Sequence, residues 1–228
     1  MTCADAQFLV NKGADSQVRM GFGLHVGWAI EGAIGSEYKI DASYLSPNVN
    51  MASRLEAATK QFGTTILFSG EFAAMLSPRV HARVRQIDCV TVKGSTHPMG
   101  LYTYDVTTER VAGPRTASAH SHRQAADPEM TSFSMQEYES EFLEHPDLAC
   151  TWAVDADFLQ RFGEGFSAYQ QGEWQKACTI LGETRGMRRS VTGDTVVDGP
   201  SQTLLDYMAG HDNQKPDNWR GYRELTEK

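Results

Sequence analysis

The feature that most constrains this chain of 228 residues is the segment from Ser46 to Gly63, SPNVNMASRLEAATKQFG, which has the pattern of one helix with well-marked ends. Ser46 offers a hydroxyl for the N-cap, Pro47 has the backbone angle that suits the first helical position, and Gly63 ends the helix. Between them, residues that suit a core recur at steps of three or four, which predicts one buried face. These residues are Val49, Ala52, Leu55, Thr59 and Phe62.

A neighbouring face of this predicted helix carries Asn50 and Arg54, which are four residues apart and therefore project together. An amide and a planar cation held side by side on a rigid helix suit a sugar oxygen and a phosphate. The alternative interpretation is an ordinary solvated face, since polar side chains at this spacing are common on helices that bind nothing.

The first hundred residues alternate between strand-like and helical patterns. Strand candidates are 18–27, 38–45, 64–69, 83–92 and 99–106, with an arm or turn at 30–36, a short helix at 70–76 and a hairpin loop at 94–98. Alternation of this kind that ends in a hairpin predicts an α/β (α+β) sandwich, in which helices cover a mixed sheet.

Two stretches of this region resemble the C-terminal half of the class III nucleotide cyclase catalytic domain, the family that makes cyclic AMP or cyclic GMP. They are VRMGFGLHVGWAIEGAIGSEYKIDASYLSPNVNMASRLE, from Val18, and VTVKGSTHPMGLYTYDV, which ends at Val106. The VN-x-A-x-R core of the helix lies between these flanks, which makes the match specific. The resemblance implies a ferredoxin-like cyclase fold, and residues 1–106 hold only its C-terminal half.

The resemblance also implies roles for four residues of this chain. Asn50 matches the Asn that orients the ribose, and Arg54 matches the Arg that stabilises the transition state. Ser43 falls where adenylate cyclases carry Asp or Thr and guanylate cyclases usually carry Cys. Because its hydroxyl resembles that of Thr, Ser43 favours ATP as substrate without excluding GTP. Lys93 matches a lysine that meets the terminal phosphates, although any lysine before a glycine turn has the same pattern.

Two departures from the family pattern precede the helix, because Ser46 replaces a Gly and Pro47 replaces an Asp or Asn. Both residues are compatible with a helix start, so we expect a locally altered entry and a retained site.

The family's metal site is a larger departure. Two aspartates on strands that precede the matched region hold Mg²⁺ or Mn²⁺ in the family, and a lysine reads the purine. Nothing before Val18 supplies these residues, so we expect no metal ligand in this chain and expect the metal ligands in a missing N-terminal half. The resemblance thus implies a phosphorus–oxygen lyase of cyclic-nucleotide signalling, present as a fragment that is inactive alone.

Because sites in this family form between two cyclase domains, a second cyclase domain is the expected partner, in a homodimer or an intrachain pair. The competing hypothesis is a non-catalytic, cyclase-like module that only recruits or regulates partners.

Charged residues are distributed unevenly between the two halves of the chain. Residues 1–110 hold ten Lys or Arg and ten Asp or Glu, whereas residues 111–228 hold eleven and nineteen, which is the whole net charge of −8. An acidic half does not favour a nucleic-acid partner, which requires a basic face. We expect a polar, flexible linker at 107–133 and an acidic helical region at 134–228.

The helical region begins with aromatic residues at helical steps, followed by Gly172 and a second apolar repeat from Trp174. This pattern predicts an αα-hairpin similar to one tetratricopeptide-like unit, which must pack on the cyclase region, a partner or a second copy. A third helix is expected to open at Asp198-Gly-Pro-Ser201. The final segment resembles the W-x-G-x-x-x-L-x-x-K tail that follows the catalytic domain in many multi-domain class III cyclases, here Trp219 to Lys228.

The sequence shows no apolar run long enough to cross a membrane and no pattern of a secretory signal. The four cysteines have no paired spacing, which indicates reduced, structural thiols. We therefore expect a cytoplasmic location, or a place in the cytosolic part of a membrane protein if further segments span a membrane.

Overall fold

The computed structural model describes residues 20–36, 38–92, 97–106, 139–140, 143–144, 154–190 and 193–225. The strands are β1 (Phe22–Leu24), β2 (Ile30–Ser36), β3 (Lys39–Leu45), β4 (Ile66–Ser69), β5 (Val84–Thr91), β6 (Met99–Tyr104) and β7 (Arg223–Glu224). The helices are α2 (Pro47–Phe62), α3 (Gly70–Ala73), α4 (Pro78–His81), α7 (Ala156–Gln171), α8 (Trp174–Thr184) and α9 (Gly199–Ala209). The mixed α/β architecture followed by helices confirms the predicted fold class.

Five strands form one mixed sheet in the order β1-β4-β6-β5-β7. The β5–β6 pair is the predicted terminal hairpin, with a register shift between Gln86 and Asp88. The end strands β1 and β7 each pair in parallel, with β4 and β5 respectively. Strand β7 belongs to the C-terminal tail, so the last described residues complete the sheet, which the tail pattern alone did not predict.

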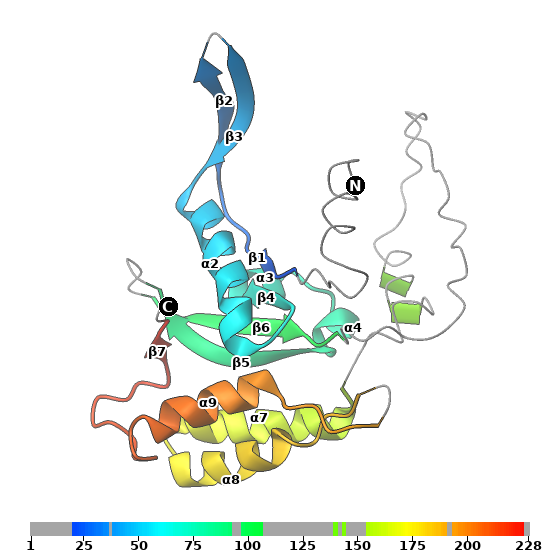
Figure 1. Ribbon diagram of the computed structural model, residues 1–228, viewed down its shortest axis with the longest axis vertical. Helices are drawn as coiled ribbons and strands as arrows, with labels where there is room; N and C mark the ends of the chain where they lie inside the picture. The colour runs from blue at the N-terminus through cyan, green and yellow to red at the C-terminus, as the bar shows by residue number, and fades with distance from the viewer. Residues whose placement is uncertain are drawn as a thin grey trace, which may run out of the picture.

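Strands β2 and β3 form a separate antiparallel hairpin, paired from Ile30 with Leu45 to Ser36 with Lys39. The sequence predicted an arm or turn at 30–36 and a strand at 38–45; the structure makes both segments strands of one arm, outside the main sheet. This arm projects away from the sheet beyond the start of α2 (Figure 1).

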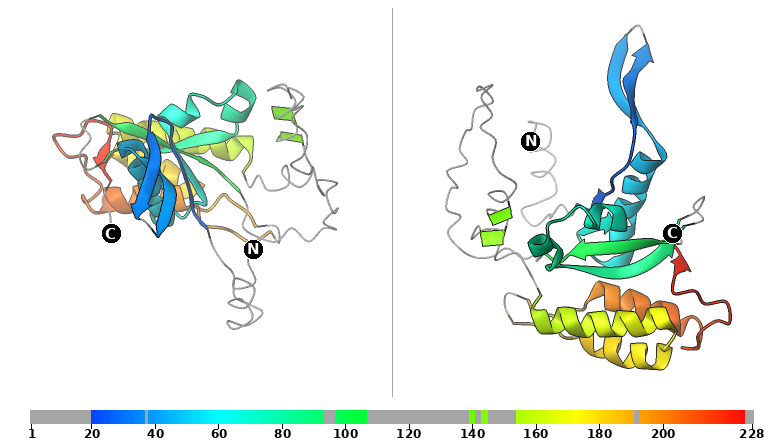
Figure 2. Two further views of the ribbon diagram at one scale, coloured as in Figure 1. Left: turned by 90° about the horizontal axis from the view of Figure 1, so that it is seen from above. Right: turned by 180° about the vertical axis from the view of Figure 1, so that it is seen from behind.

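The two faces of the sheet belong to different clusters, as the alternation along each strand requires. Leu67, Ile87 and Leu101 face the main core, which they share with α2, α7 and α9. Phe68 and Tyr104 face a smaller cluster on the other side, which includes Ala73 of α3. The helical region therefore extends the helix layer that α2 begins, and Figures 1 and 2 show α8 as the outermost helix of this layer.

Helix α2 has the predicted ends. The Ser46 side chain accepts a hydrogen bond from the Asn48 amide at 3.0 Å, and Gly63 adopts the left-handed conformation with φ of 62°. Leu55, Thr59 and Phe62 are buried as expected. The prediction was wrong for Val49, which is 42% exposed, because the first turn of α2 lies at the arm and extends past the core (Figure 1).

The αα-hairpin of α7 and α8 is also present, and it packs on the sheet of the N-terminal region, which was one of the three expected solutions. Its aromatic residues are core, as predicted: Phe158, Phe162, Phe166 and Tyr169 are at most 5% exposed. The third helix, α9, starts at the predicted Asp198 cap, whose side chain accepts a hydrogen bond from the Ser201 amide. The expected linker at 107–133 lies outside the described residues.

Two buried ionic contacts attach the helical region to the sheet. Arg85 of β5 donates two hydrogen bonds to the Asp105 carboxylate and two to the Asp198 carboxylate, at 2.6–3.1 Å. Arg223 of β7 donates from Nε to Asp88 of β5 at 2.8 Å. The Arg85–Asp198 and Arg223–Asp88 pairs join residues 113 and 135 positions apart, so these two contacts hold the C-terminal region to the sheet.

Candidate functional site

The candidate site is built on α2, which begins at a network of polar contacts. The Ser46 hydroxyl donates to the Trp28 carbonyl at 2.6 Å, and the Asn48 side chain donates to the same carbonyl at 2.8 Å. Trp28 lies between β1 and β2, so these bonds fix the start of α2 to the chain that leads into the arm. The altered entry at Ser46 and Pro47 therefore forms a capped helix start, as expected.

His25 supports the same network from the loop after β1. Its Nε2 lies 3.2 Å from Asn48 Oδ1, and its Nδ1 lies 2.8 Å from Ser69 Oγ. Asn48 Oδ1 is an acceptor, so the proton of a neutral imidazole belongs on Nε2 and Ser69 donates to Nδ1. Both ring nitrogens of His25 thus have hydrogen-bond partners, which indicates a structural role.

Strand β1 lies unusually close to α2, and glycine permits this approach. A Cβ atom at Gly23 would overlap the Ala52 carbonyl oxygen and the Glu56 amide nitrogen. Since both obstacles are backbone atoms, they cannot move aside without shifting the helix. The first strand therefore fixes the middle of α2, two residues from Arg54.

Asn50 and Arg54 project from successive turns of α2, and their side chains differ in solvent exposure. Asn50 is exposed, and Arg54 is half-buried. Arg54 lies in the wall of a groove of about 590 Å³ between α2, α9 and β7. The groove is lined by Arg54, Ala57, Ala58, Lys60, Gln61, Thr203, Asp206, Tyr207, Arg223 and Leu225. Neither member of the pair is enclosed in the core.

The two other predicted residues lie elsewhere. Ser43 is half-buried on β3 of the arm, opposite Gly32 of β2, so it belongs to a different element from Asn50 and Arg54. Lys93 lies outside the described residues. Asp41, near Ser43, forms a surface ion pair with Lys39 at 3.0 Å, which fits a local role in the arm.

The described parts of the chain hold no group of three His, Cys, Asp or Glu side chains that could bind a metal ion. The residues around Asn50 and Arg54 therefore do not fit a Mg²⁺ or Mn²⁺ site, and we derive no metal-dependent step from them. Burial raises the pKa of the Cys89 and Cys178 thiols, which disfavours the reactive thiolate and agrees with structural roles.

A large apolar surface surrounds the start of α2. Side chains of the arm and its neighbours are exposed, including Trp28 at 65%, Ile40 at 72% and Leu45 at 70%. The other large apolar side chains exposed on the arm, on the chain that leads into it and on the first turns of α2 are Met20, Phe22, Leu24, Val26, Ile30, Ile34, Tyr38, Tyr44 and Val49. Exposed apolar surface of this extent is typical of contact sites for another protein, a membrane or a ligand.

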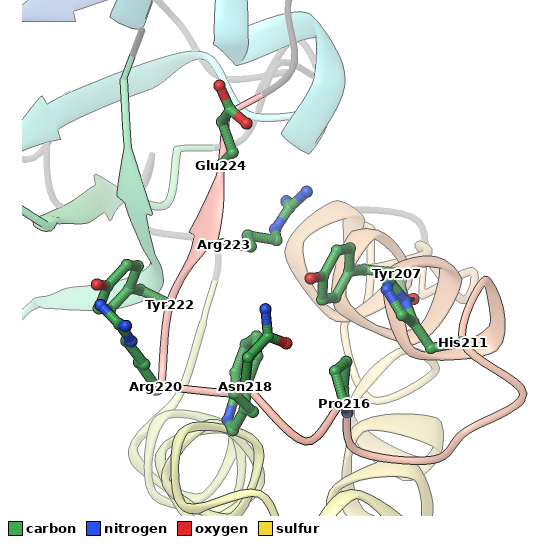
Figure 3. Close-up of a pocket in the computed structure, with 9 residues that line it drawn as sticks. Tyr207, His211, Pro216, Asn218, Arg220, Tyr222, Arg223 and Glu224 are labelled. Atoms are coloured by element: carbon green, nitrogen blue, oxygen red, sulfur yellow. Dashed lines mark hydrogen bonds between the residues drawn. The ribbon is translucent and has the colours of Figure 1, made fainter. Parts of the chain in front are cut away.

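Sequence reasoning missed the residues that join the tail to the sheet. The Arg223 side chain extends from β7 toward α9, where its guanidinium carbon lies 4.9 Å from the centre of the Tyr207 ring (Figure 3). Trp219 packs edge-on against Tyr169 with 5.0 Å between ring centres. The W-x-G pattern marked this segment, but nothing local indicated that it would pair with β5.

The structure defines a mixed α/β domain in which α2 presents Asn50 near an uncovered apolar arm and Arg54 at a groove formed with α9 and β7. The profile of the adenylate and guanylate cyclase catalytic domain family matches residues 1–107. Adenylate cyclase 1 of Rhizobium meliloti (strain 1021) is 31% identical over 86 residues, which is 38% of this chain and 13% of that protein. The adenylate cyclase of Anabaena cylindrica is 34% identical over 87 residues, or 38% and 17% of the two chains.

A solved structure of a bacterial light-regulated adenylyl cyclase matches 37% of this chain and 23% of its own, with 30% identity and a TM-score of 0.32. Residues 1–107 of this chain are thus similar to the adenylate and guanylate cyclase catalytic domain. The matches cover less than a fifth of the length of the two curated relatives. Among the described residues, no helix is both long and apolar enough to cross a membrane.

Proposed function

We propose that this chain is part of a purine nucleotide cyclase that converts ATP to cyclic AMP and pyrophosphate. The observation that carries the proposal is the presentation of Asn50 and Arg54 on one firmly held helix. The helix is capped at Ser46, packed closely on β1, and leaves both side chains outside the core.

The chemistry needs the groups that this helix offers. The ribose 3′ oxygen attacks the α-phosphorus, and the bond from that phosphorus to the pyrophosphate oxygen breaks. Asn50 would orient the ribose, and Arg54 would stabilise the charge that develops on the phosphoryl oxygens. Removing an arginine with this role commonly costs about 10³-fold or more in rate.

ATP is the proposed substrate for two reasons. The relatives reported above are named adenylate cyclases. In addition, Ser43 has a hydroxyl that can donate or accept a hydrogen bond, like the Thr of some adenylate cyclases. Lys93 would meet the terminal phosphates, as the family resemblance implies.

The proposed partner is a second cyclase domain, and the apolar arm supports this choice. Side chains such as Ile40 and Leu45 are exposed on the arm, next to the start of α2 that carries Asn50. A domain that covered this surface would also enclose the site. Mg²⁺ or Mn²⁺ would then bind to ligands outside the described residues, in keeping with the metal requirement that the family resemblance implies.

A complementation assay tests the proposal. The partner is the catalytic domain of a related adenylate cyclase that keeps its two metal aspartates but has Ala in place of its own Asn and Arg. We expect cyclic AMP from ATP and Mn²⁺ only when this domain is mixed with the present chain. Asn50→Ala or Arg54→Ala should abolish the product, whereas Arg161→Ala, a change at a half-buried position of α7 that does not line the groove, should not.

The same mixture examines the competing function. Size-exclusion chromatography reports whether the two proteins associate. Association without any cyclic AMP would overturn the cyclase proposal in favour of a binding module, and cyclic AMP that persists in Arg54→Ala would remove Arg54 from the mechanism.

A further inference from the structure

The C-terminal region contacts the end of the helix that carries Asn50 and Arg54. The Thr203 hydroxyl of α9 lies 3.0 Å from the Gln61 carbonyl oxygen, in the last turn of α2, and 3.0 Å from the Gly199 carbonyl oxygen of its own helix, so it shares its proton between the two helices. Gly199, the first residue of α9, packs against the backbone of Phe62 and Gly63 so closely that a Cβ atom would overlap the Phe62 carbonyl oxygen. Two contacts from α9 thus reach the final turn of α2.

The tail adds a third contact. The Arg223 guanidinium carbon lies 5.8 Å from the centre of the Phe62 ring, while its Nε is bonded to the buried Asp88. Phe62 itself is fully buried. The last side chain of α2 is therefore enclosed by the sheet, α9 and the tail strand together.

These contacts come from a part of the chain that is itself fixed to the sheet. Asp198 caps α9 and receives two hydrogen bonds from Arg85 of β5. The Arg85 guanidinium also lies 4.3 Å from the centre of the Phe162 ring of α7. Because α9 is held on β5 at the same end that touches α2, a displacement of α9 would displace the end of α2.

We propose that the C-terminal helical region is a structural part of the catalytic unit, in which Gly199, Thr203 and Arg223 are positioning residues for α2. Arg54 lies eight residues before Phe62, which is about 12 Å along the helix axis. A small tilt at the buried end therefore moves the guanidinium, and misplacement by about 1 Å can cost about 10²-fold in rate. This catalytic consequence depends on the proposed function, whereas the positioning itself does not.

Hydrogen exchange measured by mass spectrometry on the whole chain tests the positioning. Gly199→Ala should force the Phe62 backbone away and make amides of residues 51–62 exchange faster, by about 10-fold or more. Gly163→Ala is the matched control, because a Cβ there meets nothing within 4 Å. The exchange of α7 and α8 amides should change little in either variant.

A second, milder pair of variants controls for general unfolding. Thr203→Val removes the hydroxyl that reaches Gln61 and should speed exchange near the end of α2 by about 5-fold. Thr179→Val removes a hydroxyl that bonds only within α8, to Gln175, and should leave α2 unchanged. Unchanged α2 exchange in both Gly199→Ala and Thr203→Val, or an equal increase in all helices, would overturn the inference.

The complementation assay separates this inference from the proposed function. Thr203→Val should lower kcat for cyclic AMP formation while the KM for ATP stays within about twofold, and Thr179→Val should match the unaltered chain. If α2 exchange rises as expected but no variant makes cyclic AMP, the positioning stands and the cyclase proposal fails. If cyclic AMP forms and kcat is the same in both threonine variants, the catalytic part of the inference fails.

Discussion

Replacing Asp198 by Ala should destabilise the whole fold, because this carboxylate joins the helical region to the sheet. It is fully buried, accepts two hydrogen bonds from Arg85, and accepts two more from the amide and hydroxyl of Ser201. Removing one partner of a buried ion pair costs about 3–5 kcal/mol when the other charge is left unpaired. Arg85 keeps its two hydrogen bonds to Asp105, so we expect the lower end of this range, about 3 kcal/mol. For a chain of this size, that loss lowers Tm by roughly 6–12 °C.

Two further variants identify the cause of the loss. Asp198→Asn keeps a good N-cap and should recover about 1 kcal/mol relative to Ala, while still losing the charge. Asp206→Ala is the control, because this carboxylate is exposed on the same helix and bonds only to Gln202 at 2.6 Å. Urea unfolding followed by circular dichroism gives the free energies. If Asp198→Ala and Asp206→Ala lie within about 1 kcal/mol of each other, the attachment proposed for Arg85 is wrong.

Three other outcomes follow from the structure. Burial alone would raise the pKa of Asp198, but the Arg85 charge holds this pKa below its ordinary value. The stabilisation that Asp198 gives the folded chain is therefore present above about pH 4 and is lost as pH falls through the lower folded pKa. Urea unfolding at pH 7, 5 and 3 should show that the difference in unfolding free energy between the unaltered chain and Asp198→Asn narrows in acid, and a difference that widens in acid contradicts this. Trp219→Ala should cost about 3–5 kcal/mol by opening the cluster with Tyr169, measured by urea unfolding, with Trp28→Ala as the exposed control. In the complementation assay, Ser43→Cys should raise GTP turnover relative to ATP, and an unchanged preference would remove Ser43 from the site.

The parts of the fold that the sequence predicted well are those specified by neighbouring residues. Helix α2 was delimited by Ser46 and Gly63, whose capping roles depend only on the adjacent backbone. The αα-hairpin followed from aromatic spacing and from Gly172, which adopts a left-handed conformation at the turn. The pair on α2 was found by spacing, and its possible chemistry came from resemblance to a family.

The parts that the sequence could not predict depend on segments that meet only in the folded chain. Arg85 and Asp198 are 113 positions apart, and Arg223 and Asp88 are 135 apart. A lone arginine in a strand pattern gives no indication of its partner, and a two-residue strand is too short to show a period. Val49 was wrongly predicted to be buried, because helical periodicity identifies the apolar face of a helix but not how far along the helix other elements cover that face.

The two ends of α2 differ in a way that limits how a partner domain can approach. The C-terminal end is enclosed by the chain itself, with Phe62 fully buried beneath α9 and β7. The N-terminal end carries exposed Asn50 and Val49 beside an arm whose large side chains are also uncovered. Because α7 and α9 pack on β5 and α8 lies outside them, the C-terminal helices cover the sheet beside α2, and a second cyclase domain in the proposed enzyme would approach from the arm. That approach brings it to Asn50 first and then along the helix to Arg54.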